Sequence, residues 1–97
     1  MSIPGSYFVY ILASKKHGTL YIGVTNSLRA RLELHRSGKG SVFVTKYGVT
    51  RLVYMEEYGS PLEAIQREKQ LKEWHRDWKI RLIKQENPDW DDLSHLL

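Results

Sequence analysis

The chain has 97 residues, of which 41% are hydrophobic and 27% charged, and it contains no cysteine. These values are typical of one soluble globular domain, and they exclude a fully disordered chain, a fibrous repeat, disulfide bonds and thiolate chemistry. Lysine and arginine number 15 against 11 acidic residues, so the net charge is +4. A small basic domain favours a polyanionic partner, nucleic acid first, although such a charge can also serve solubility alone.

The charges are unevenly distributed along the chain. Seven cations and three acids lie between residues 66 and 84, whereas acids gather in a tail over about 86–97. We therefore expect a single domain over 1–97 with a basic stretch and an acidic tail. No apolar run approaches the ~18–20 residues of a membrane span, and the start has no signal-peptide pattern. With the absence of cysteine, this favours a cytoplasmic protein without a membrane partner.

The first half of the chain predicts a β-hairpin followed by a helix. Residues 7–14 are aromatic and β-branched, which is typical of a strand covered on both faces, and a polar turn over 15–18 leads to a second strand over 19–24. Asn26 is the expected N-cap of a helix over 27–37, and Gly38 is placed to end it. Residues 38–48 hold three glycines and two lysines, and predict a basic loop.

The second half predicts one strand and two helices. A third strand is expected over 49–57, and Ser60, Pro61 and Glu63 form a strong helix start with a capping box. This helix should end near residue 74 and be followed by another that ends near 86, before Asn87-Pro88. The order β-β-α-β-α-α predicts an α+β domain in which helices pack on a small antiparallel sheet.

One carboxylate lies where the helical pattern requires an apolar residue. Leu62, Ile65 and Leu71 mark the expected buried stripe of the second helix, and Glu68 falls inside it. A buried carboxylate is costly unless it is paired or binds a metal ion. The alternatives are a salt bridge, for instance to an arginine, or a position at the rim.

The first helix and the hairpin supply further inward-facing polar groups. Arg31 and His35 are four residues apart, within an arc marked by Leu28, Leu32 and Leu34. If Ser14 pairs with Thr19, Tyr10 lies opposite Gly23 and is a diagonal neighbour of Tyr21, about 7–8 Å away. Each residue alone has a structural explanation, such as a snorkelling arginine, a hydrogen-bonded histidine or a strand-forming tyrosine.

Together these residues would form a site with two phenols, a guanidinium, an imidazole and one carboxylate. A single carboxylate, completed by water and phosphate oxygens, is the usual way in which proteins hold Mg²⁺. An arginine beside it suits the charge that develops at a reacting phosphate.

The pair Phe8-Val9-Tyr10 and Tyr21-Ile22-Gly23 resembles the paired motif of the GIY-YIG nuclease superfamily. Arg31, His35 and Glu68 stand where that superfamily places its arginine, its frequent histidine and its metal-binding glutamate. The resemblance covers nearly the whole chain and is greatest to small stand-alone bacterial members, which are related to the nuclease domain of the bacterial excision-repair enzyme. Phe8 replaces the glycine that gives the first motif its name.

The resemblance implies a three-stranded antiparallel sheet flanked by helices, and an endonuclease that hydrolyses phosphodiester bonds in DNA, or in RNA. Tyr10 or Tyr21 would act as general base, Arg31 would stabilise the transition state, and Glu68 would hold one Mg²⁺ or Mn²⁺ ion. His35 would relay a proton or hold a phosphate. The expected contacts to nucleic acid are Lys46 in the basic loop, with Arg67, Lys69 and Lys72 in the basic stretch.

The resemblance leaves two functions open. One is a metal-dependent nuclease that acts on DNA structures or in DNA repair, and that takes its specificity from a protein partner. The other is a module of weak or no catalytic activity that binds nucleic acid or a partner and retains the fold.

Overall fold

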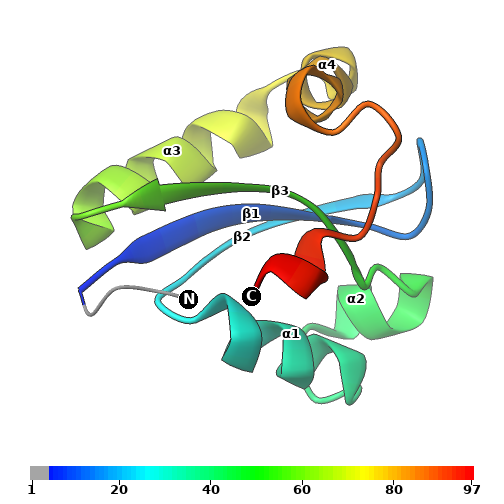
Figure 1. Ribbon diagram of the computed structural model, residues 1–97, viewed down its shortest axis with the longest axis horizontal. Coiled ribbons are helices and arrows are strands. Elements are labelled where there is room, and N and C mark those ends of the chain that lie inside the picture. Colours follow the sequence, from blue (N-terminus) through cyan, green and yellow to red (C-terminus); the bar gives the residue numbers. More distant parts are fainter. Residues whose placement is uncertain (1–4) are drawn as a thin grey trace.

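The computed structural model describes residues 5–97 as a three-stranded antiparallel sheet with helices on both faces (Figure 1). The strands lie in the order β2-β1-β3, so that β1 is central. The elements are β1 (Tyr7–Ala13), β2 (Leu20–Thr25), α1 (Leu28–Arg36), α2 (Val42–Tyr47), β3 (Arg51–Tyr58), α3 (Pro61–Glu73), α4 (Arg76–Glu86) and a 3-10 helix, η1 (Leu93–Leu96). The α+β class and the element order are confirmed, with α2 and η1 as additions.

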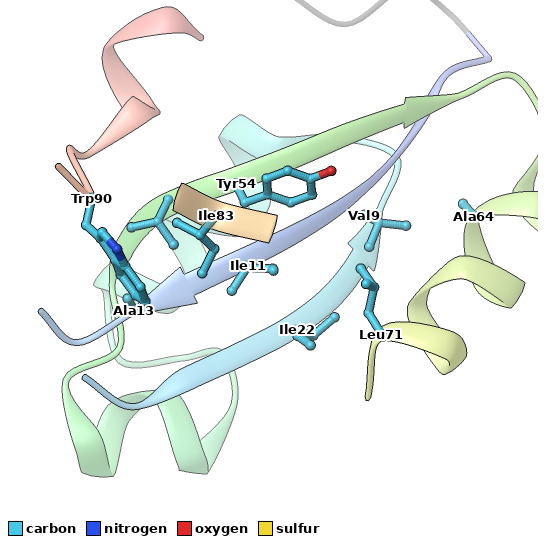
Figure 2. Packing of buried hydrophobic residues seen from close by; sticks show 10 residues of the cluster. Val9, Ile11, Ala13, Ile22, Tyr54, Ala64, Leu71, Ile83 and Trp90 are labelled. Atoms are coloured by element: carbon cyan, nitrogen blue, oxygen red, sulfur yellow. The ribbon is translucent and has the colours of Figure 1, made fainter. Parts of the chain in front are cut away.

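The central strand divides the core into two layers, as its continuous apolar sequence predicts. Val9 and Ile11 face α3 and α4, within the cluster drawn in Figure 2. Tyr10 and Leu12 face α1, α2 and η1 on the opposite side. All four side chains are fully buried, which confirms a strand covered on both faces.

The connection from β2 to β3 differs from the expected capping and loop. Ser27, not Asn26, is the N-cap of α1, and its hydroxyl accepts a hydrogen bond from the Ala30 amide at 3.3 Å. The expected loop over 38–48 contains α2, which begins after Ser41 and ends at Gly48, where φ is 63°. Serine at the start and a left-handed glycine at the end are sufficient signals for a short helix.

Helix α3 presents a different face to the sheet from the expected one. Leu62 and Ile65 are 64% and 39% exposed, whereas Ala64 and Leu71 are fully buried. The small Ala64 lets the helix approach the sheet closely. Ser60 is the N-cap and Pro61 follows it, but the Ser60 side chain makes no capping hydrogen bond, so the capping box is not formed. Leu34 of α1, also expected to face inward, is 44% exposed.

Over residues 5–97, no helix is both long and apolar enough to cross a membrane. The first four residues, on which the expectation of no signal peptide partly rests, lie outside the described residues.

Candidate functional site

The hairpin brings the two tyrosines together. The Ser14 amide donates to the Thr19 carbonyl at 3.0 Å, and this register places Tyr10 opposite Gly23. The Tyr10 and Tyr21 rings have centroids 6.3 Å apart, so the predicted diagonal pair is present. The space in front of Gly23 is filled by Tyr10 itself, since a Cβ atom on Gly23 would lie 2.6 Å from Tyr10 Cζ.

His35, which lies on α1, packs against both tyrosines. Its Nε2 atom lies 3.2 Å from the Tyr10 hydroxyl, and its ring centroid lies 5.3 Å from that of Tyr21. The side chain is buried, and Nδ1 has no hydrogen-bond partner. Gly40 closes over that atom, because a Cβ atom there would lie 2.6 Å from Nδ1. Burial, and next the nearby Arg31 charge, lower the pKa of His35.

Two opposite charges act on the Tyr10 hydroxyl. Burial is the main cause that raises the pKa of Tyr10, and the neighbouring Tyr21 raises it further. The Arg31 charge lowers this pKa and the Glu68 charge raises it, so both groups lie close enough to influence the phenol. Arg31 is half-buried on α1, and Glu68 is half-buried on α3. Tyr21 and His35 thus pack beside Tyr10, and the charges of Arg31 and Glu68 lie within range of its hydroxyl, so four elements contribute to these surroundings.

The neighbours of Glu68 show whether a salt bridge can account for its half-buried carboxylate. The adjacent Arg67 does not pair with it. Within residues 5–97, the cation in salt-bridge range of Glu68 is Lys72, whose Nζ atom lies 3.5 Å away. The Glu68 side chain is 16% exposed and that of Lys72 is 54% exposed. Such a partly exposed pair contributes about 0–1 kcal/mol, so Glu68 lacks the strong partner that a structural carboxylate requires.

The donor set fits one hard divalent cation held by few protein ligands. The described part of the chain contains no group of three or more histidine, aspartate and glutamate side chains that could form a metal cage. Glu68 offers carboxylate oxygens, and the tyrosine hydroxyls nearby are also oxygen donors. Mg²⁺ and Mn²⁺ accept such a site when water and phosphate oxygens complete it.

The four expected nucleic-acid contacts have different surroundings. Lys46 is exposed on α2, 5.4 Å from the Tyr47 ring centroid, and Lys69 is exposed on α3. Lys72 lies beside Glu68, as described. Arg67 is engaged elsewhere, because its Nε and Nη2 atoms donate to the two oxygens of Glu56 at 2.9 and 3.0 Å.

A groove of about 230 Å³ adjoins the site and contains residues that sequence reasoning missed. Its lining comprises Leu20, Tyr21, Ile22, Phe43, Lys72 and Lys79. Sequence reasoning misses Phe43 because the glycines of residues 38–48 predict a loop, although Ser41 is an N-cap signal two residues before it. The sequence marks Lys79 only as one cation of the basic stretch.

Residues 6–81 match the family model of the GIY-YIG catalytic domain. UPF0213 proteins from Staphylococcus aureus strains Mu3 and Mu50 are each 39% identical over 80 residues, covering 82% of this chain and 96% of each relative. The solution NMR structure of a UPF0213 protein from Bacillus halodurans has a TM-score of 0.56 at 31% identity, over 94% of this chain and 96% of that one. This chain therefore belongs to the GIY-YIG catalytic-domain family, whose members are generally nucleases.

Proposed function

We propose that the protein is a metal-dependent endonuclease that hydrolyses phosphodiester bonds in nucleic acid, with DNA as the first substrate to test. The surroundings of Tyr10 carry this proposal. A buried phenol that is in contact with an imidazole and lies under the influence of both a guanidinium and a carboxylate is unusual in a purely structural core.

The two tyrosines have different surroundings, which suggests a division of roles. Tyr10 is fully buried and its pKa is raised, so its phenol stays protonated near neutral pH. Tyr21 is half-buried and lines the groove. We assign the contact with the attacking water, and the general-base role, to Tyr21. Tyr10 then orients the reacting groups by hydrogen bonding.

His35 acts on the reaction through Tyr10. Its lowered pKa keeps the imidazole neutral at neutral pH, so one ring nitrogen carries a proton. An unpaired buried N–H costs more than an unpaired acceptor, and Nδ1 has no partner. We therefore place the proton on Nε2, which donates to the Tyr10 oxygen. The Tyr10 O–H is then free to donate to the hydroxyl of Tyr21, which lines the groove.

We assign the two charged residues, Arg31 and Glu68, to the phosphate. The Arg31 charge acts on Tyr10, and its guanidinium would donate to the nonbridging oxygens, where negative charge grows in the transition state. Glu68 would hold one Mg²⁺ or Mn²⁺ ion. When bound, such an ion neutralises charge on the phosphate and on the leaving oxygen.

One observation favours the second candidate, a binding module without catalytic activity. The Lys72 ammonium lies 3.5 Å from Glu68, where it offsets part of the carboxylate charge without any metal ion. A nucleic-acid-binding domain that had lost its metal would have the same arrangement.

A cleavage assay separates these two functions. Supercoiled plasmid and a structured RNA are incubated with the protein in Mg²⁺, in Mn²⁺ and in EDTA. We expect nicking with either metal and none in EDTA. Arg31→Ala should reduce the rate about 10³-fold. Arg29→Ala, an exposed change on the same helix, is the matched control and should cleave normally.

Two results would reject the endonuclease. Equal cleavage by wild type and Arg31→Ala would show that the activity lies elsewhere. Metal-independent binding with no cleavage of either substrate would establish the binding module.

A further inference from the structure

The groove beside the site crosses the free edge of the sheet. Strand β2 is an edge strand, and its residues Leu20, Tyr21 and Ile22 line the groove. The side chains of Ile22 and Tyr21 lie on opposite faces of the sheet, in the two separate core clusters. Phe43 borders the groove from one layer of helices, and Lys72 and Lys79 border it from the other.

The groove is continuous with the proposed catalytic cluster through two shared residues. Tyr21 belongs to both, because its ring packs against His35 and also lines the groove. Lys72 connects them on the other side, with its ammonium 3.5 Å from Glu68. A strand of nucleic acid whose phosphate lies at Tyr21 and Glu68 would therefore pass over this groove.

The lining combines the two kinds of group that recognise a nucleotide. Phe43 is 41% exposed, and its ring lies 6.3 Å from that of Tyr21 with an interplanar angle of 30°. The Tyr47 ring packs on Phe43 as well, with centroids 4.8 Å apart. A partly exposed aromatic ring of this kind can stack on a base. Two lysines supply positive charge, and no acidic residue lines the groove within residues 5–97.

Lys79 is held in place, unlike a freely solvated lysine. Its Nζ atom donates to the Lys72 backbone carbonyl at 3.3 Å, and the side chain is half-buried. Burial, and next the charge of Arg76, lower the pKa of Lys79. An anion between the two lysines would relieve this unfavourable electrostatic environment.

We propose that this groove binds one nucleotide of the substrate strand, adjacent to the phosphate that is cleaved. Its base stacks on Phe43, and its phosphate lies between the ammonium groups of Lys72 and Lys79. As a substrate subsite, the groove rests on the endonuclease function proposed above.

The test measures binding without hydrolysis. A fluorescein-labelled oligonucleotide of about 12 nucleotides is titrated with the full chain in EDTA, and anisotropy gives Kd. Phe43→Leu keeps an apolar side chain but removes the aromatic face, and should weaken binding about 5- to 100-fold. Lys79→Ala should weaken binding less, and should reduce the slope of log Kd against log salt by about 0.7–0.9, the value for one phosphate contact.

Matched controls come from the same helices. Val42→Ala shortens another exposed apolar side chain of α2, and Lys84→Ala removes another exposed lysine of α4; neither residue lines the groove. Both variants should bind as wild type does. An NMR titration of the wild-type protein with deoxyadenosine monophosphate needs no variant, and should shift the amide signals of the groove residues first.

Several results would overturn the subsite. These are wild-type affinity in Phe43→Leu and Lys79→Ala, equal losses in the two controls, or no binding of the oligonucleotide by wild type. Failure of the endonuclease function gives a different pattern. In that case the groove variants lose affinity as expected, but wild type cleaves nothing in Mg²⁺ or Mn²⁺.

Discussion

Gly23→Ala tests the packing that positions the Tyr10 hydroxyl. The new Cβ atom would lie 2.6 Å from Tyr10 Cζ, and the hydroxyl oxygen would be nearer still. An ordinary contact needs at least ~3.4 Å, so the ring would have to move by roughly 1 Å. Tyr10 is fully buried and its hydroxyl lies 3.2 Å from His35 Nε2, so it cannot move freely. Overpacking costs about 1–3 kcal/mol, and the lost hydrogen bond adds about 1 kcal/mol.

Urea denaturation monitored by circular dichroism measures this loss. We expect Gly23→Ala to lower the free energy of unfolding by about 2–4 kcal/mol, with an unchanged m-value. Gly59→Ala is the control, because nothing lies within 4 Å of the atom it adds. Its effect should be small, up to about 1 kcal/mol of stabilisation.

A double-mutant cycle shows whether the Tyr10 hydroxyl is the cause. In a Tyr10→Phe background the nearest clashing atom is gone, so Gly23→Ala should cost about 1–2 kcal/mol less than in wild type. The packing argument is refuted if Gly23→Ala is as stable as wild type, or if its cost is the same in both backgrounds.

Three further outcomes follow from the site and from the way α3 is held. Tyr21→Phe should lower the cleavage rate about 10²–10⁴-fold. Tyr10→Phe should lower the rate less, but it should lower the free energy of unfolding by about 1–3 kcal/mol. The reverse order of rates would make Tyr10 the base. Arg67→Met should lower the free energy of unfolding, measured in urea, by about 2–4 kcal/mol, because it leaves the half-buried Glu56 carboxylate without its cation. Fluorescence anisotropy should show an unchanged affinity of this variant for DNA. A weaker affinity would restore Arg67 as a phosphate contact. The folded-state pKa of His35 lies below the unfolded value of about 6.5. The stability that the neutral His35 contributes is therefore fully present above pH 6.5 and declines as the pH falls toward the folded pKa. Urea denaturation between pH 7.5 and pH 5 should show this decline in wild type and a shallower decline in His35→Gln.

The sequence predicts the hairpin well because local rules control it. A short polar turn fixes which residues pair, so the position of Tyr10 opposite Gly23 follows once Ser14 is paired with Thr19. The alternation of side chains along the strands then places Tyr10 and Tyr21 on one face.

The sequence predicts the wrong face of α3, because a salt bridge between distant residues and close packing set the rotation of the helix. Arg67 reaches Glu56 on β3, and the small Ala64 rather than Ile65 is fully buried. No periodicity within α3 contains this information. Glu68 still lies on the inward line, because it is four residues after the buried Ala64 and three before the buried Leu71.

The groove could not be predicted from the sequence. Its lining comes from four elements on both sides of the sheet, and one of them, α2, is a six-residue helix between glycines. Such a short helix has too few turns for a periodic apolar pattern to stand out.

The replacement of Glu68 tests most directly whether this site is a metal-dependent nuclease. Single-turnover cleavage of a labelled DNA substrate is measured in Mg²⁺ for wild type, Glu68→Gln and Glu63→Gln, the last an exposed carboxylate of the same helix. Loss of the weak Lys72 pair should change stability by at most about 1 kcal/mol, so Glu68→Gln should fold normally. The account predicts cleavage by wild type and Glu63→Gln and none by folded Glu68→Gln. Cleavage by Glu68→Gln at the wild-type rate would contradict it.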